Sequence, residues 1–165
     1  IGYVGNVRDR LDVELVARLS EENLSWNIVM IGAAHGNPPV LSLHGRANVH
    51  FLGVKCYEDA VRYIRHFDVA IMPHLDNEVS RRMNPLKLYV YAASGVPTVS
   101  TAVQNIEEAA EFAHVEPSHE AFVRRVDDII SHPDKYRRKS DFVLPSSITW
   151  TERVNAMISA IDSNL

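Results

Sequence analysis

Short apolar runs alternate along the chain with longer segments in which apolar residues recur at helical spacing. The apolar runs cover residues 1–5, 27–32, 49–53, 68–72, 97–100 and, more weakly, 113–116. Their cores are continuous apolar stretches rather than alternating patterns, which is typical of strands covered on both faces of a sheet. Strands that alternate with helices require parallel pairing and right-handed crossovers. The pattern therefore predicts an α/β domain with a Rossmann-like, doubly wound parallel sheet of about six strands.

Helices are predicted in the segments between these runs. Apolar positions spaced three to four residues apart lie at 11–19, 57–64, 85–94, 122–130 and 150–161. The helix at 85–94 has the clearest boundary signals, because Asn84 is a good N-cap and Pro85 suits the first helical position. Gly95 fits the residue after the helix, and Pro97 prevents continuation. These signals predict a helix with defined ends.

Three of the predicted strands end in glycine, at Gly5, Gly32 and Gly53. The carboxyl ends of parallel strands meet at one edge of the sheet, and ligands of such folds bind beyond that edge. Each glycine alone could simply permit a tight turn, since glycine is common in turns. Three together at one edge favour a ligand crevice.

Composition and charge narrow the class of protein. The chain has 165 residues, 46% of them apolar and 23% charged, with a net charge of −4. This size and composition fit one globular domain over residues 1–165 and exclude a disordered or disulfide-stapled chain. The acidic balance argues against a nucleic-acid partner. With one cysteine, Cys56, no intrachain disulfide is possible, and no apolar run is long enough to span a bilayer.

A basic cluster surrounds the start of the helix at 85–94. Arg81, Arg82 and Lys87 are the three cations, and the helix N-terminus adds unpaired backbone N–H groups and a partial positive charge. A basic residue in a first helical turn opposes the helix dipole, a cost that a bound anion would explain. The cluster therefore suits a diphosphate. The alternative is a solvated basic turn without a ligand.

A second basic element, Arg8 and Arg10, follows the glycine that ends the first strand. In the predicted fold this turn lies beside the helix that begins near Asn84. Two basic turns facing one crevice would neutralise a pyrophosphate without a metal. Alternatively, Asp9 and Asp12 pair with these arginines at the surface, and for Arg10 we favour that pairing.

Other kinds of chemistry are disfavoured. The eight histidines show no tight ligand spacing, which together with the single cysteine makes a metal site improbable. His35 and His74 follow the second and fourth strands, and both are interpreted as loop histidines rather than catalytic bases. The chain has no G-x-S-x-G nucleophile elbow and no G-x-G-x-x-G dinucleotide motif. A serine hydrolase and a nicotinamide dehydrogenase are therefore not expected.

A series of motifs runs in order along nearly the whole chain. They are Gly-Asn-Val-Arg at 5–8, Phe-Leu-Gly at 51–53, Phe-Asp-Val-Ala-Ile-Met-Pro at 67–73, Asn-Pro-Leu-Lys-Leu-Tyr at 84–89 and Gly-Val-Pro-Thr-Val-Ser at 95–100. In combination they resemble the C-terminal, donor-binding domain of GT-B glycosyltransferases, in particular the family 4-like, "glycosyl transferases group 1" enzymes.

The resemblance implies two Rossmann-like domains that face a cleft. The C-terminal domain binds a nucleotide-sugar donor, with UDP-linked sugars among the candidates, and the missing N-terminal domain binds the acceptor. The sugar moves to an acceptor hydroxyl, typically without a metal or other cofactor and with retention of configuration. Lys87 and Arg8 would contact phosphate, Asn84 and Leu88 would line the donor pocket, and residues 53–57 would lie near the base. The expected donor-binding residues are Gly5, Arg8, Gly53, Arg82, Asn84, Pro85, Lys87 and Leu88.

Two positions depart from the family pattern. Val90 stands where relatives usually carry a Glu that holds the ribose hydroxyls, and Asn6 stands where many carry a basic residue. A hydrogen bond to a charged group contributes roughly 1.5–3 kcal/mol, which valine cannot supply. The alternatives are a degenerate, non-catalytic domain kept for protein contacts, or half of a sugar-nucleotide epimerase of the same architecture.

The organisation of the whole protein follows as a set of expectations. The chain has no signal-peptide pattern and no initial Met, so we interpret it as part of a longer two-domain protein. The missing signal and the nucleotide donor favour a cytoplasmic location and a role in polysaccharide biosynthesis, and a peripheral membrane contact of the parent protein is left open. The chain alone is expected to be inactive, and no catalytic residue is identified.

Overall fold

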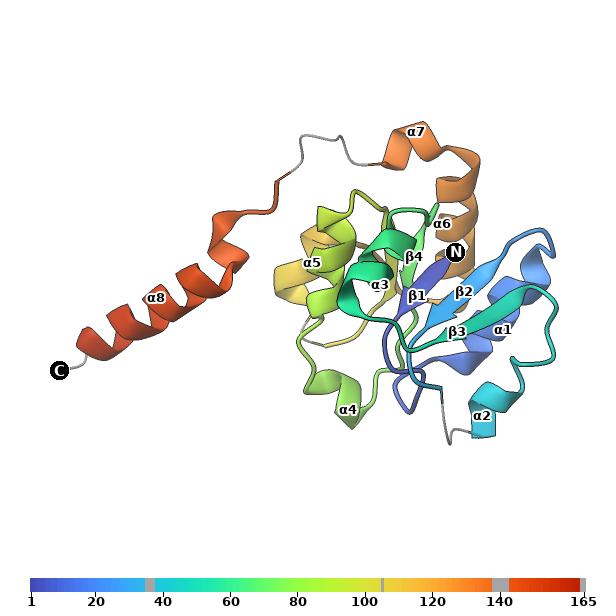
Figure 1. The fold of residues 1–165 in the computed structure, drawn as a ribbon, viewed down its shortest axis with the longest axis horizontal. Coiled ribbons are helices and arrows are strands. Elements are labelled where there is room, and N and C mark those ends of the chain that lie inside the picture. The colour runs from blue at the N-terminus through green and yellow to red at the C-terminus, as the bar shows by residue number, and fades with distance from the viewer. Residues whose placement is uncertain (35–37, 105, 138–142, 164–165) are drawn as a thin grey trace.

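The computed structural model describes residues 1–34, 38–104, 106–137 and 143–163, and its centre is a six-stranded parallel sheet (Figure 1). The strands are β1 (Gly2–Val4), β2 (Ile28–Ile31), β3 (Val49–Gly53), β4 (Ala70–Met72), β5 (Thr98–Thr101) and β6 (His114–Glu116). Their order is β3-β2-β1-β4-β5-β6, and all the pairings between them are parallel. The predicted α/β class, strand number and Rossmann-like topology are confirmed.

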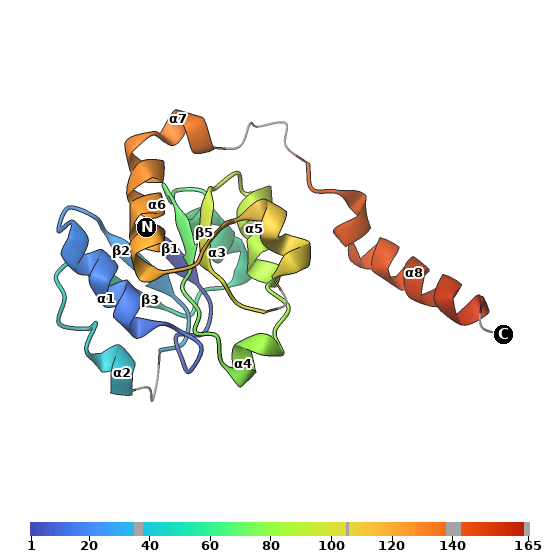
Figure 2. The ribbon, with the colours of Figure 1, turned by 180° about the vertical axis from the view of Figure 1, so that it is seen from behind.

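Helices cover both faces of this sheet (Figures 1 and 2). The α-helices are α1 (Val13–Glu22), α2 (Pro38–Leu41), α3 (Tyr57–Ile64), α4 (Glu78–Arg81), α5 (Leu86–Ala93), α6 (His119–Ser131), α7 (Pro133–Tyr136) and α8 (Trp150–Asp162), and two 3-10 helices lie at η1 (Glu107–Phe112) and η2 (Ser146–Ile148). Apolar residues of α1 and α6 join one buried cluster, and those of α3 and α5 join a second. The strands contribute side chains to both clusters, as a sheet covered on two faces requires.

The strand order places β1 and β4 side by side in the middle of the sheet. From β1 the chain proceeds outward through β2 and β3, and from β4 it proceeds in the opposite direction through β5 and β6. In doubly wound sheets a ligand crevice opens at this point, beyond the carboxyl ends of the two central strands. A ligand site is therefore expected at the loops that follow β1 and β4.

The start of α5 differs from the sequence prediction. The helix begins at Leu86, and Pro85 rather than Asn84 is its N-cap, with no side-chain cap bond. The backbone carbonyl of Asn84 instead accepts a hydrogen bond from the Leu86 N–H at 2.9 Å, which closes a tight turn before the helix. The predicted Asn84 cap is therefore wrong. The predicted end of the helix is confirmed, because Gly95 directly follows the C-cap residue Ser94 and has a φ of +74°.

The short helix α4 was not predicted, because its four residues are too few to show a periodicity. The side chain of Asn77 caps it by accepting from the Ser80 N–H at 2.9 Å. This helix holds the segment between β4 and α5, including the basic residues of the predicted cluster, in one arrangement.

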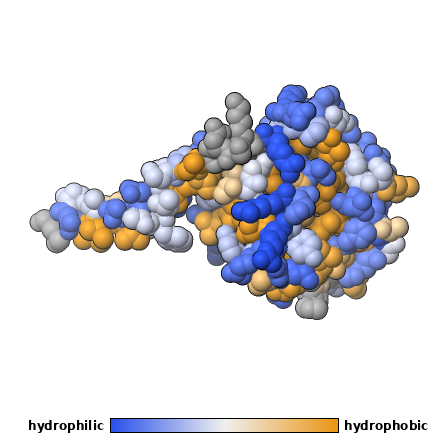
Figure 3. Space-filling model, turned by 45° about the horizontal axis from the view of Figure 1, so that its top comes forward, coloured by the Kyte–Doolittle hydropathy of each residue, from blue (hydrophilic) through white to orange (hydrophobic). Residues whose placement is uncertain are grey.

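The last helix, α8, lies away from the sheet in both views (Figures 1 and 2). The predicted helix is present, but its apolar residues remain 46–72% exposed and form an uncovered edge (Figure 3). They are Trp150, Val154, Met157, Ile158 and Ile161. Within the described ranges, no helix is long and apolar enough to cross a membrane.

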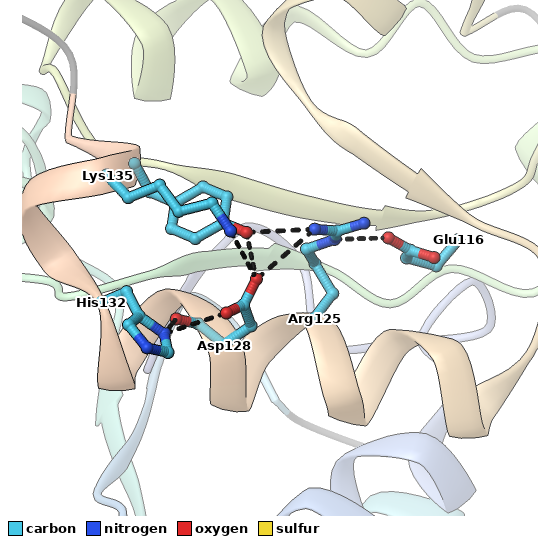
Figure 4. A network of polar contacts seen from close by, with 6 residues as sticks. Glu116, Arg125, Asp128, His132 and Lys135 are labelled. Carbon is cyan, nitrogen blue, oxygen red and sulfur yellow. Dashed lines mark hydrogen bonds and ion pairs between the residues drawn. The ribbon is translucent and has the colours of Figure 1, made fainter.

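A network of polar contacts joins α6 and α7 to the edge strand β6 (Figure 4). Arg125 Nε donates to Glu116 Oε1 at 2.7 Å, and Arg125 Nη1 donates to Tyr136 Oη at 3.2 Å. Asp128 accepts from the Tyr136 hydroxyl and lies 3.3 Å from Lys135 Nζ. The opposite charges satisfy one another within this cluster, which fits a structural role.

Replacing Arg125 by methionine is expected to destabilise the protein by about 1–3 kcal/mol, because Glu116 would keep a partly buried carboxylate without its partner. Urea denaturation followed by circular dichroism measures this loss. Arg124→Met is the matched control, since Arg124 is an exposed neighbour on the same helix, and it should stay within about 0.5 kcal/mol of the wild type. Equal losses in the two variants would contradict a role for the network.

Candidate functional site

The loop after β1 and the first turn of α5 meet at the carboxyl edge of the sheet. A Cβ placed on Gly5 would lie 2.7 Å from Lys87 Nζ, so the glycine leaves the room that the amine occupies. The Val4 N–H donates to Tyr91 Oη at 2.9 Å, which ties the end of β1 to α5. The predicted proximity of Gly5 and Lys87 is therefore present in the structure.

The Lys87 amine is enclosed by polar and aromatic groups rather than by carboxylates. Its Nζ lies 4.2 Å from the centre of the Tyr3 ring and 3.4 Å from His74 Nε2. Burial, together with a smaller effect of the positive charge of Arg10, lowers the pKa of Lys87 from 10.5 to about 7. At neutral pH the amine is therefore close to half charged.

His74 is the residue of this site that the sequence did not reveal. It follows β4 and was interpreted as a loop histidine, but its side chain is only 2% exposed. Burial, Lys87 and Arg10 together lower the His74 pKa to about 2, so the ring is neutral. Its Nδ1 has no hydrogen-bond partner among the described residues, and its Nε2 lies 3.4 Å from Tyr3 Oη. Its position directly after a central strand was the signal that could have identified it.

Tyr3 forms the floor of the site. Its hydroxyl donates to the Asn6 carbonyl at 3.0 Å, which fixes the loop after β1. Burial raises the pKa of Tyr3 to about 12, an effect that Arg10 partly opposes. Tyr3 is therefore uncharged, and its aromatic ring lies beneath the Lys87 amine. A protonated amine over the face of such a ring is stabilised by a cation–π interaction.

The predicted basic cluster at 81–87 is divided by ion pairs. Arg81 Nε donates to Asp76 Oδ1 at 3.1 Å, and Arg82 pairs with Glu78 one turn away on the helical segment. The Arg82 side chain is 78% exposed. Arg81 and Arg82 therefore each have an acidic partner that precedes them in the chain. Of the three predicted cations, Lys87 is the one whose amine lies beside Gly5.

The second basic element also differs from the prediction. Arg8 is exposed, whereas the charge of Arg10 acts on Lys87, His74 and Tyr3. The carboxylate of Asp12 instead caps α1 through the Leu15 N–H and lies 2.8 Å from His119 Nε2. The favoured surface pairing of Arg10 is therefore wrong, and it is the charge of Arg10 that acts on the lysine.

The remaining predicted site residues differ in how far they are exposed to solvent. The Leu88 side chain is 0% exposed in the core, so it is not available to line a pocket. Asn84 is exposed and Pro85 is buried directly before α5. Gly53 has a φ of +68° and open space around it, and it lies beside exposed Val54 and Tyr57. His35 lies outside the described residues.

This arrangement can bind an anion. A partly charged amine, a nearby arginine and a glycine loop converge beyond the ends of β1 and β4, with no carboxylate of the described residues acting on Lys87. In the part of the chain that the structure describes, no group of three or more His, Cys, Asp or Glu side chains could hold a metal ion. Phosphate is the common biological anion that a lysine and a glycine-rich loop bind at such an edge.

Comparison with known proteins identifies the family. The family model described as "Glycosyl transferases group 1" matches residues 1–132, and the chain belongs to this family. It is 23% identical over 124 residues to the "Putative teichuronic acid biosynthesis glycosyltransferase TuaH" of Bacillus subtilis (strain 168), an alignment that covers 72% of this chain and 31% of that protein. The resemblance drawn from the sequence motifs is thereby confirmed at the level of the family.

A solved structure confirms the fold. A mutant O-GlcNAc transferase of Thermobaculum terrenum matches 97% of this chain and 34% of its own, with a TM-score of 0.58 and 12% sequence identity. The chain thus spans about a third of the length of both relatives. These matches establish the fold and the family.

Proposed function

We propose that this chain is the donor-binding half of a glycosyltransferase that moves a sugar from a nucleoside diphosphate to an acceptor hydroxyl. The observation that supports it best is the enclosed Lys87 amine at the switch point of the sheet, beside Gly5 and under the influence of the charge of Arg10. A diphosphate beside Lys87 would supply the negative charge that the site lacks. The family membership and the teichuronic acid relative favour a role in polysaccharide biosynthesis.

The cationic site would act on the leaving group. When the bond between sugar and diphosphate breaks, negative charge grows on the departing phosphate oxygens. A fixed lysine and a neighbouring arginine stabilise that charge more strongly in the transition state than in the ground state. This chemistry needs no metal, and we propose a metal-independent transfer with retention of configuration.

The rest of the protein would supply the acceptor side. The matches cover only about a third of each of the two similar proteins, and the apolar edge of α8 is uncovered (Figure 3). Exposed apolar patches of this kind usually contact another surface. We propose that the other domain of the same protein covers α8, completes the cleft and binds the acceptor, and that this chain alone has no transferase activity.

Calorimetric titration with UDP, GDP and dTDP tests the donor site. Saturable binding of one nucleotide is expected, and Lys87→Ala should abolish it, since the charge on the phosphate would lose its partner. Arg124→Ala, an exposed cation on α6, is the control and should bind as the wild type does. An affinity unchanged by Lys87→Ala would contradict the site, and sugar transfer by this chain alone would contradict the two-domain proposal.

Val90→Glu distinguishes a functional donor site from a degenerate module. Val90 is partly buried on α5, one residue before Tyr91. A carboxylate there should accept hydrogen bonds from the ribose hydroxyls and tighten UDP binding about tenfold. Inorganic pyrophosphate has no ribose, so its affinity should stay unchanged, as should UDP binding by the control Val90→Leu. If neither Val90→Glu nor the wild type binds a nucleotide, a non-catalytic domain kept for protein contacts is favoured instead.

A further inference from the structure

The surroundings of Lys87 have a feature that anion binding alone does not explain. His74 is buried beside the amine, yet it is neutral and its Nδ1 has no partner among the described residues. Buried polar atoms are nearly always hydrogen-bonded, so an unpaired one calls for an explanation. No described residue bonded to Nδ1 fixes which nitrogen carries the proton, so both tautomers are available to His74.

The Nε2 side of the ring faces two groups at the same distance. Nε2 lies 3.4 Å from both Tyr3 Oη and Lys87 Nζ. The Tyr3 hydroxyl proton goes to the Asn6 carbonyl, so the tyrosine oxygen is left as an acceptor. A protonated Nε2 can donate to Tyr3 and leaves Lys87 uncharged, whereas a bare Nε2 accepts from a charged Lys87. The ring can therefore match either state of the amine.

We propose that the enclosed Lys87 amine takes up a proton when a phosphate anion binds beside it, and that His74 is a positioning residue whose Nε2 then accepts a hydrogen bond from the charged amine. The inference rests on the proposed function, because it concerns the same donor site. The proton comes from solvent and is added to Lys87 Nζ, which then donates to the phosphate and to His74 Nε2. His74 stays neutral throughout and changes only its tautomer.

The charged and titratable groups around Lys87 support this behaviour. Tyr3 faces the amine from β1 and His74 from the loop after β4. The charge of Arg10, in the loop after β1, also acts on the amine. Tyr91, on α5 itself, is bonded to the backbone of β1, and burial raises its pKa. None of these groups is an acid that would be ionised at neutral pH. The lowered pKa of Lys87, about 7, agrees with an amine that is largely uncharged at pH 8.

Calorimetry with inorganic pyrophosphate at pH 8, in buffers of different ionisation enthalpy, measures the protons taken up per anion bound. The wild type should take up about one proton more than Lys87→Arg, whose guanidinium is always charged. The comparison removes the protonation of pyrophosphate itself, because both proteins bind the same probe.

Two variants of His74 test its part. His74→Phe keeps a ring but loses Nε2, and it should weaken pyrophosphate binding about tenfold. His74→Gln places an amide oxygen near the position of Nε2, and it should restore most of the affinity, which a purely space-filling role would not produce. His66→Gln, at an exposed histidine in the turn after α3, is the control.

Each outcome separates the two proposals. Pyrophosphate binding that Lys87→Met abolishes, with equal proton uptake in the wild type and Lys87→Arg, would overturn the inference and leave the donor site standing. Wild-type affinity in His74→Phe would also overturn it. Failure of the wild type to bind pyrophosphate or any nucleotide would overturn both proposals.

Discussion

Replacing Lys87 by methionine is expected to stabilise the unliganded protein and to abolish diphosphate binding. In the folded state the pKa of Lys87 is lowered from 10.5 to about 7, chiefly by burial. Each unit of such a shift corresponds to 1.36 kcal/mol, so at pH 7 the lysine destabilises the fold by up to about 4 kcal/mol. Methionine keeps the unbranched stem without the charge, and urea denaturation should show the gain.

The stabilising effect of Lys87→Met should depend on pH. Between about pH 7 and pH 10.5 the unfolded chain binds more protons at this lysine than the folded chain does. The wild type should therefore gain stability as the pH rises from 7 towards 10, and Lys87→Met should lack that gain. A stability difference between the two proteins that is the same at pH 7 and pH 9.5 would contradict a lowered pKa.

Lys135→Met supplies a contrast. Lys135 is exposed, and its pKa is raised by contacts with Tyr136 and Asp128. A raised pKa means that the charged form is favoured in the fold, so this replacement should destabilise the protein slightly. The two lysine variants should therefore change stability in opposite directions.

Gly32→Ala is expected to be among the most destabilising single changes in the sheet. A Cβ at this position would lie 2.0 Å from the Gly5 carbonyl oxygen, and the φ of Gly32 is +142°. The neighbouring atom is backbone and cannot rotate away, so the loop after β1 would have to move. We expect a loss of about 3 kcal/mol or more, measured by urea denaturation.

Gly53→Ala is the matched control for this change. Gly53 ends the adjacent strand with a φ of +68°, but a Cβ there would meet nothing within 4 Å. The left-handed backbone conformation is the one unfavourable feature for alanine at this position, and it should lower the free energy of unfolding by about 1 kcal/mol. If Gly53→Ala were as damaging as Gly32→Ala, the close approach of Gly32 to Gly5 would not be the cause.

The fold could be predicted from the sequence because its signals are local. Continuous apolar runs identified all six strands, and helical spacing identified the main helices. The glycines at strand ends were also informative, and Gly32 packs closely against the backbone of Gly5. The start of α5 was predicted wrongly, since a tight turn at Asn84 competes with side-chain capping there.

The candidate site could be predicted only in part. Lys87 was identified from the charge pattern, but its environment is assembled from three separate segments that contribute Tyr3, Arg10 and His74. Spacing along the chain carries no signal for such a cluster. The ion pairs of Arg81 and Arg82 were missed for a related reason, because residue charge alone does not show which acid lies within reach.

Whether a diphosphate binds beside Lys87 is tested most directly by calorimetric titration of this chain with inorganic pyrophosphate and UDP, comparing the wild type with Lys87→Met. We expect saturable binding by the wild type and none by Lys87→Met, although that variant is the more stable protein. Equal binding by the two proteins would contradict the site, and so would its absence from both.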